Sequence, residues 1–171
     1  MKLARTHYLD ASAIVKIFLI EDGSDRIKQY FEKESGFHTT SLCFPEALGV
    51  LKSKHFKRGK MSEEEYLTSA DELLGLLSDG IIEIGDVNIN DRSVFCGVEA
   101  LVRKYRIDIS DAFQIVSVKG NYFSQFKSDS KPILITADAD LARAARSESL
   151  RVWNIIEESE PSAVNVGWEK S

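Results

Sequence analysis

Apolar residues along the chain alternate between short continuous runs and longer stripes with helical spacing. The clearest stripe covers residues 62–78, where apolar positions recur at nearly every turn behind a Ser-Glu-Glu-Glu start of the capping-box type. The clearest strand covers residues 132–136, which are apolar without alternation, as in a strand buried on both faces. The pattern therefore predicts a fold that mixes both kinds of element.

Strands and helices are predicted to alternate along the whole chain. The strands are predicted at residues 6–9, 36–40, 81–84, 132–136 and 150–155. The helices are predicted at residues 12–20, 25–33, 41–59, 62–78, 90–105, 111–122 and 138–147. Short strands that alternate with longer helices are typical of a parallel sheet covered on both faces. We therefore expect a single α/β domain with a short parallel sheet.

Composition narrows the class of protein. A chain of 171 residues is long enough for one domain with its own core, and no apolar run approaches the roughly 20 residues of a membrane helix. We recognise no signal peptide. Cys43 and Cys96 form neither a zinc pattern nor a disulfide framework, so a cytoplasmic protein is expected. The net charge of −5 disfavours a nucleic-acid coat protein but not an enzyme that holds nucleic acid locally.

Four acidic residues occupy comparable places relative to these elements. Asp10 separates the first strand from its helix, Glu46 lies in the first turn after the second strand, and Asp138 directly follows the fourth. Parallel strands end at one edge of a sheet, so these three are expected along it. Asp111 opens a helix that follows another helix, and periodicity does not place it. Each acid taken singly is equally well explained as a helix cap or as a complement to the helix dipole.

Carboxylates gathered at one edge repel one another unless a cation lies between them. Oxygen ligands without nearby His or Cys suit hard ions, which indicates Mg²⁺ or Mn²⁺. At about 100° per residue, Glu46 points away from the apolar stripe of its helix, which is formed by Phe44, Leu48 and Leu51. That side of the helix also carries Gly49, Ser53 and Lys57. It is small and polar, as the wall of a groove would be.

Residues 52–60 are the densest basic stretch of the chain. The candidate RNA-binding side chains in it are Lys52, Lys54, Lys57, Arg58 and Lys60. A solvated helix end whose cations suit the dipole and a surface that contacts phosphates explain this run equally well.

Four segments resemble, in order and spacing, the PIN-domain nuclease family: YLDASAIVKIF, FPEALGVL, ISDAFQIVSV and ILITADADLARAA. The resemblance covers residues from about 8 to 155 and predicts a PIN-like domain at 1–156 with a C-terminal extension at 157–171. It implies that the family's acidic quartet corresponds to Asp10, Glu46, Asp111 and Asp138, and it brings the Asp111 helix to the same site.

The resemblance also assigns roles to the neighbours of the quartet. Ser12 and Thr136 match the accessory hydroxyl positions of the family. Asp140 is a second acid beside Asp138, and either one could be the innermost metal ligand. Residues 121–131 are expected to form a long loop. That loop and the tail after residue 155 are departures from the small VapC-like toxins of the family.

The resemblance implies a Mg²⁺- or Mn²⁺-dependent ribonuclease that hydrolyses RNA phosphodiester bonds in the cytoplasm. A VapC-like toxin would have an antitoxin partner, and it would form a homodimer through its first helices and residues 62–78. Two alternatives stay open: a catalytically silent PIN fold that acts as a binding module, and a phosphoacceptor receiver-like domain. A receiver would need adjacent acids after the first strand and a lysine after the last.

Overall fold

Five parallel strands form the sheet of the computed structural model, which describes residues 6–120 and 132–161. The strands are β1 (His7–Leu9), β2 (Phe37–Thr39), β3 (Ile82–Ile84), β4 (Ile133–Thr136) and β5 (Arg151–Asn154). Their order in the sheet is β3-β2-β1-β4-β5. The chain starts in the centre, extends to one edge through β2 and β3, and then returns to build the other edge. The strand order therefore reverses between β1 and β4.

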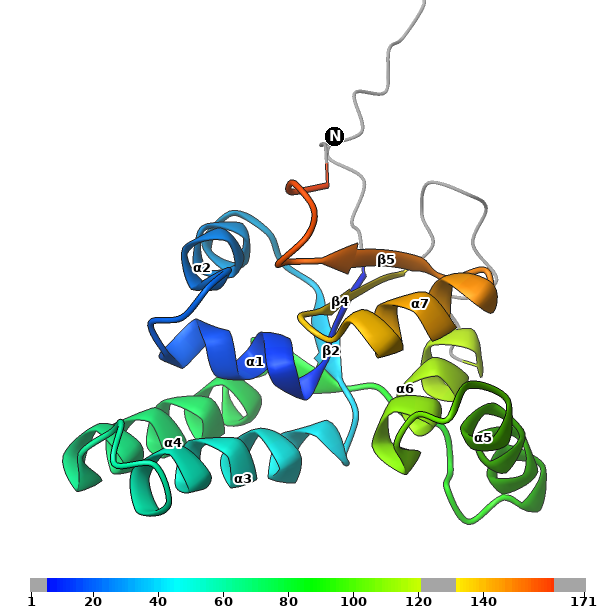
Figure 1. Cartoon of the computed structure of the whole chain (residues 1–171), viewed down its shortest axis with the longest axis horizontal. Coiled ribbons are helices and arrows are strands. Elements are labelled where there is room, and N and C mark those ends of the chain that lie inside the picture. Colours follow the sequence, from blue (N-terminus) through cyan, green and yellow to red (C-terminus); the bar gives the residue numbers. More distant parts are fainter. Residues whose placement is uncertain (1–5, 121–131, 162–171) are drawn as a thin grey trace, which may run out of the picture.

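Seven helices in the described part of the chain connect and cover these strands (Figure 1). They are α1 (Ala11–Phe18), α2 (Ser24–Lys33), α3 (Cys43–Phe56), α4 (Glu63–Ser78), α5 (Arg92–Tyr105), α6 (Ile109–Gly120) and α7 (Ala139–Ser147). Helices α1 to α4 pack on one face of the sheet, and α5 to α7 pack on the other. The predicted α/β fold with both faces covered is confirmed.

Two apolar cores hold these layers together, because successive side chains of a strand point to opposite faces. Leu9, Ile133 and Ile135 pack into the core beneath α1 to α4. Tyr8 and Leu134, which alternate with them, pack into the core beneath α5 to α7. All five side chains are fully buried. The central strands β1 and β4 are thus fixed from both sides, and so is the point at which each of them ends.

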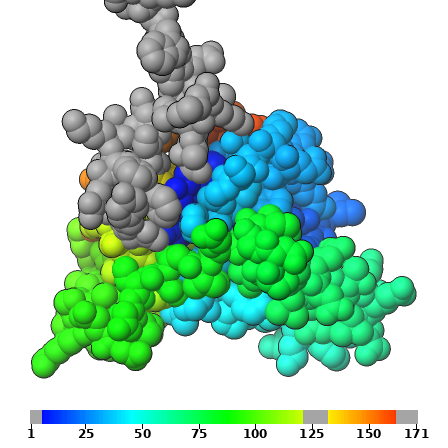
Figure 2. Space-filling model, turned by 180° about the vertical axis from the view of Figure 1, so that it is seen from behind, coloured from blue at the N-terminus to red at the C-terminus, as the bar shows by residue number. Residues whose placement is uncertain are grey.

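Seen from behind, α5 and the α3–α4 hairpin project as two separate lobes (Figure 2). The edge strand β3 and the segment that leads from it to α5 lie between them. Helix α4 begins with the predicted capping box: the Ser62 hydroxyl accepts the Glu65 N–H at 3.1 Å, and the Glu65 carboxylate accepts the Ser62 N–H at 2.7 Å. The hairpin therefore starts its second helix at a well-defined residue.

Some predicted boundaries are wrong. Helix α6 begins at Ile109 rather than Asp111, because the Asp108 carbonyl already accepts the Ala112 N–H at 3.0 Å. Helix α3 ends at Phe56, before the expected stop at Gly59. The predicted end of α6 at residue 122, the loop at 121–131 and most of the extension at 157–171 lie outside the described residues.

The strand order tests one alternative function directly. Receiver-like folds have the order 2-1-3-4-5, with the reversal between the first and third strands. Here β1 lies between β2 and β4. The receiver-like alternative is therefore excluded by topology. None of the helices in residues 6–120 and 132–161 is long and apolar enough to cross a membrane.

Candidate active site

Asp10 lies buried at the joint between β1 and α1. Its Oδ2 accepts the backbone N–H of Ser12 at 3.2 Å, so Asp10 caps α1. The same oxygen accepts hydrogen bonds from the hydroxyl of Ser12 and, at 2.8 Å, from the hydroxyl of Thr136. The two predicted accessory hydroxyls thus contact Asp10 directly. A cap and a site residue were alternative interpretations, and the geometry is compatible with both at once.

The same hydroxyls tie the end of β1 to the end of β4. The Ala137 N–H donates to Ser12 Oγ at 2.8 Å, and the Asp138 N–H donates to Thr136 Oγ1 at 2.9 Å. The Asp138 carboxylate in turn caps α7, since its Oδ1 accepts the backbone N–H groups of Asp140 and Leu141. A carboxylate offers two oxygens with about four lone-pair sites, so capping does not exhaust it. The reversal point of the sheet is therefore closely cross-linked by polar contacts.

A cleft of about 320 Å³ opens at this reversal point, which is where ligands bind in open α/β sheets. Its walls come from α1, α3, the start of α6 and the β4–α7 joint. Apart from Glu21, the acids that line it are Asp10, Glu46, Asp108, Asp111 and Asp138. The structure thus brings all four predicted quartet members to one cleft. Periodicity alone did not predict the position of Asp111, but in the structure this residue lines the same cleft as the other three.

Asp108 was missed by the sequence analysis because residues 107–110 were interpreted as a break. It precedes Asp111 by three residues, a spacing that puts two side chains on the same side of a helix. The Ser110 side chain hydrogen-bonds Glu46, which brings the start of α6 against the first turn of α3. The sequence signal was the spacing of the two aspartates.

The environment of the cleft raises the pKa of three of its carboxylates, those of Asp10, Glu46 and Asp111. The pKa of Asp111 is raised to about 7, mainly by burial and also by the negative charges of Asp10, Asp138, Glu46 and Asp108. Burial also raises the pKa of Glu46, with a smaller contribution from Asp10. Burial raises the pKa of Asp10, although the hydrogen bonds from its two hydroxyl partners oppose this. The cleft therefore stores electrostatic repulsion that a cation would relieve.

The two candidates for the innermost acid after β4 are clearly separated. Asp138 lines the cleft, whereas Asp140 is not among the residues that line it and forms an ion pair with Arg143 at 2.8 Å. Asp140 and Arg143 are three residues apart on one exposed face of α7. The structure thus places Asp138, and not Asp140, with the other acids.

The residues of the predicted basic run also fall into two groups, those that line a cavity and those that face solvent. Lys54 lines the acidic cleft, and Lys60 lines a neighbouring cavity that shares Lys54 and Glu21 with it. Lys52, Lys57 and Arg58 are exposed and line neither. Most of the basic run thus faces solvent at the tip of the hairpin.

The side of α3 that faces the cleft was also predicted incorrectly. Gly49, Ser53 and Lys57 were expected beside Glu46, but Val50 and Lys54 line the cleft instead. Of the predicted stripe, Leu51 is fully buried, whereas Phe44 and Leu48 are only partly buried against the core. The other fully buried residues of α3 are the smaller Cys43 and Ala47. Because these residues are buried, α3 is rotated about its axis by a fraction of a turn relative to the predicted orientation.

The donor set of the cleft suits a hard divalent cation. Its acids offer only carboxylate oxygens, and no His or Cys is among the residues that line it. As the side chains stand, no three His, Cys, Asp or Glu residues of the described chain form a group that could hold a metal ion. The chemistry of the ligands therefore fits Mg²⁺ or Mn²⁺, while their shared coordination would require side-chain rotation.

This fold and this cleft define an α/β protein with an acidic site at its topological reversal point. The model of the PIN domain family matches residues 7–147, and the chain belongs to that family, whose members are generally nucleases. Its fold is similar to that of a chain in the crystal structure of FitAcB from Neisseria gonorrhoeae. The TM-score is 0.55 at 12% identity, over 90% of this chain and 100% of the other. No curated protein sequence matches the chain.

The double role of Asp10 leads to a test with two substitutions. Asp10→Asn keeps an oxygen that can accept the three hydrogen bonds and removes the charge, so the free energy of unfolding should be unchanged or higher. Asp10→Ala also removes the cap and should be less stable than Asp10→Asn by about 1 kcal/mol. Chemical denaturation in the presence of a chelator measures both. Equal stability of the two variants would mean that the cap contributes nothing.

The raised pKa of Asp111 predicts how stability depends on pH. Its folded-state pKa of about 7 lies above the ordinary value of 3.8, so the folded state retains a proton that the unfolded state releases. This contribution is fully present below about pH 3.8 and is lost as the pH rises towards 7. Without divalent ions, the stability of the parent relative to Asp111→Asn should therefore fall across this range.

The control for the pH experiment is Asp140→Asn, which removes an acid outside the cleft. Its denaturation curves should follow the pH dependence of the parent. A parallel pH dependence of the parent and Asp111→Asn would show that the cleft does not perturb Asp111.

Proposed function

We propose that the chain is a Mg²⁺- or Mn²⁺-dependent ribonuclease that hydrolyses RNA phosphodiester bonds. The observation that carries this proposal is the meeting of Asp10, Glu46, Asp111 and Asp138 in one cleft at the reversal point of the sheet. Membership of the PIN domain family supports a nuclease. The raised pKa of Asp111 and of Glu46, caused by burial and by neighbouring carboxylates, supports a cation as the missing partner.

The four quartet residues would hold the ion. Asp10 is the best positioned, because Ser12 and Thr136 fix its carboxylate, while Glu46 and Asp138 are exposed enough to turn towards it. A divalent cation at such a site supplies polarisation of the phosphate, activation of a water and stabilisation of the leaving oxygen. The hydroxyls of Ser12 and Thr136 would keep the direction of Asp10 constant as substrate enters.

Covalent catalysis by the nearby cysteine does not compete with this proposal. Cys43 is buried in the core beneath α1 to α4, and burial together with Asp10 raises the pKa of its thiol to about 12. Only the thiolate is an effective nucleophile. Direct attack of water on the phosphate therefore fits the cleft better than a covalent intermediate on the protein.

A catalytically silent binding module is the remaining alternative. Neighbouring carboxylates add to the burial that raises the pKa of Asp111 and of Glu46, and such repulsion destabilises the fold when no cation is bound. A module that only binds RNA would do so more easily without this concentration of negative charge. The acidic cleft therefore favours a catalyst over a silent member of the family.

Cleavage of single-stranded RNA tests the proposal. The chain should cut RNA with Mg²⁺ or Mn²⁺ and should lose this activity in excess chelator. Asp10→Asn, Asp111→Asn and Asp138→Asn should each lower the rate by about a hundredfold or more. Asp140→Asn is the matched control and should retain most activity. Undiminished cleavage in excess chelator would refute the metal mechanism.

We further propose that the chain acts as a homodimeric toxin with an antitoxin partner. Leu67 and Leu74 lie seven residues apart on α4 and are 52% and 50% exposed, and Ile20 after α1 is 95% exposed. Apolar residues with this spacing form one face of a helix, as a subunit contact would require. An antitoxin would place a basic side chain near Asp10 and Asp138, where it would neutralise the cleft.

The dimer and the toxin role can be tested with one set of variants. The parent should sediment as a dimer and should arrest growth when expressed alone, whereas Leu74→Glu should sediment as a monomer. Ile84→Glu introduces the same charge at a residue of similar exposure on β3 and should leave the dimer intact. A parent that remains monomeric at high concentration and is harmless to its host would contradict this role.

A further inference from the structure

Two lysines face the same cleft as the acids. Lys16 comes from α1 and Lys54 from α3, and their side chains are only 12% and 13% exposed. They are the only cationic side chains among the described residues that line the cleft. Lysine is rarely buried without a partner, so their position inside an acidic cleft needs a physical explanation.

Helical spacing fixes where the lysines lie relative to the acids. Lys16 follows Ser12 by four residues on α1, and Lys54 follows Glu46 by eight on α3, so each stays on the cleft side of its helix. At 1.5 Å per residue these steps are about 6 and 12 Å along helices that start at the sheet edge. The cleft is therefore acidic at the sheet edge and basic at its outer end.

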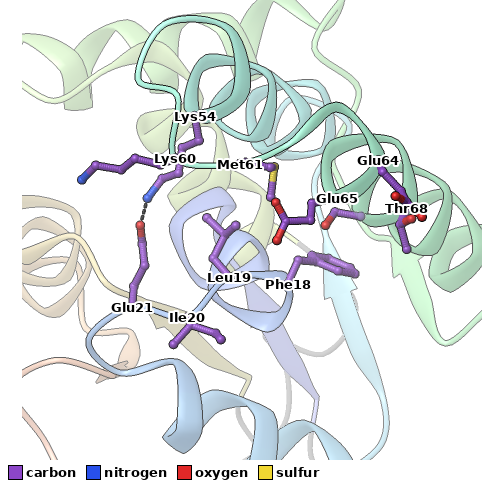
Figure 3. A pocket seen from close by; sticks show the side chains of 11 residues that line it. Phe18, Leu19, Ile20, Glu21, Lys54, Lys60, Met61, Glu64, Glu65 and Thr68 are labelled. Carbon is purple, nitrogen blue, oxygen red and sulfur yellow. Dashed lines mark ion pairs between the residues drawn. The ribbon is translucent and has the colours of Figure 1, made fainter.

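One carboxylate joins the two ammonium groups. Lys16 Nζ lies 3.3 Å from Glu21 Oε2, and Lys54 Nζ forms an ion pair with Glu21 Oε1. Figure 3 shows the Lys54–Glu21 pair at the border of a second cavity of about 590 Å³. An ammonium group carries three donors, so each lysine keeps donors for a further anion. The three side chains together carry a net charge of +1.

The position of the lysines has an electrostatic cost. Burial lowers the pKa of both lysines, and for Lys54 the nearby charges of Lys16, Lys60 and Arg58 lower it further. The cations at the outer end thus repel one another, as the carboxylates do at the inner end. A bound anion would relieve this repulsion.

We propose that Lys16 and Lys54 form a phosphate-binding subsite that holds the RNA strand at the outer end of the cleft. The inference rests on the proposed ribonuclease function and extends it. A strand whose scissile phosphate lies at the acids would place a neighbouring phosphate at the lysine pair. From there the strand would continue past Glu21 into the second cavity. Of the two lysines, the basic run identified only Lys54 as a candidate, and it did not separate this residue from its exposed neighbours.

Binding of RNA by an uncleaving protein tests this subsite. In the Asp10→Asn background, the affinity for a fluorescently labelled single-stranded RNA is measured at several salt concentrations. Lys16→Met and Lys54→Met should each weaken binding by about tenfold, as expected for one charge-assisted contact. Each should also reduce the slope of log K against log salt by about 0.7, the value for one phosphate of a single strand.

The matched control is Lys52→Met, which removes the same charge from an exposed position on α3 outside the cleft. It should change neither affinity nor slope appreciably. If Lys16→Met and Lys54→Met behave like this control, or if they only lower the melting temperature, the pair merely holds α1 to α3 and the inference is wrong. If the Asp10→Asn protein does not bind RNA and the parent does not cut it, the proposed function fails as well.

Discussion

The buried carboxylate of Asp10 is the constraint on which the rest of the site depends. A charged group can be buried only with hydrogen bonds or an opposite charge to replace water. Ser12 and Thr136 supply the hydrogen bonds, and by doing so they join the ends of β1 and β4. Since the strand order reverses between these two strands, the same contacts define the floor of the cleft. The position of Asp138 follows, because it lies two residues after Thr136 and its N–H donates to the Thr136 hydroxyl.

The charges of the cleft are separated rather than mixed. Carboxylates that include Asp111, whose pKa is raised by burial and by its acidic neighbours, lie at the sheet edge, and two lysines joined by Glu21 lie one to two helical turns away. Each group is unfavourable by itself and becomes favourable with a ligand of opposite charge. A polyanion that reacts at a cation-dependent centre satisfies both groups at once. The proposed ribonuclease and its phosphate subsite therefore follow from the same charge distribution.

The sequence predicted those features that depend on local pattern and parallel topology. The helix behind Ser62, the buried strand β4 and the common edge for Asp10 and Asp138 needed only periodicity and strand direction. The placement of Asp111 needed the packing of α6 against α5 and its core, which no local pattern contains. The family resemblance supplied that placement. The cleft side of α3 was predicted incorrectly, because the rotation of a helix about its axis depends on which of its apolar residues pack against neighbouring elements. In α3 the buried residues include small ones such as Ala47.

The most direct test of the central claim is to locate a divalent cation in the cleft. Crystals soaked in millimolar Mn²⁺ give an anomalous signal that identifies the ion without reference to activity. The account predicts a peak beside Asp10 that is shared with at least one of Glu46, Asp111 and Asp138, and the loss of that peak in Asp10→Asn. A cleft without a peak, or an ion bound only at exposed acids such as Asp140, would contradict it.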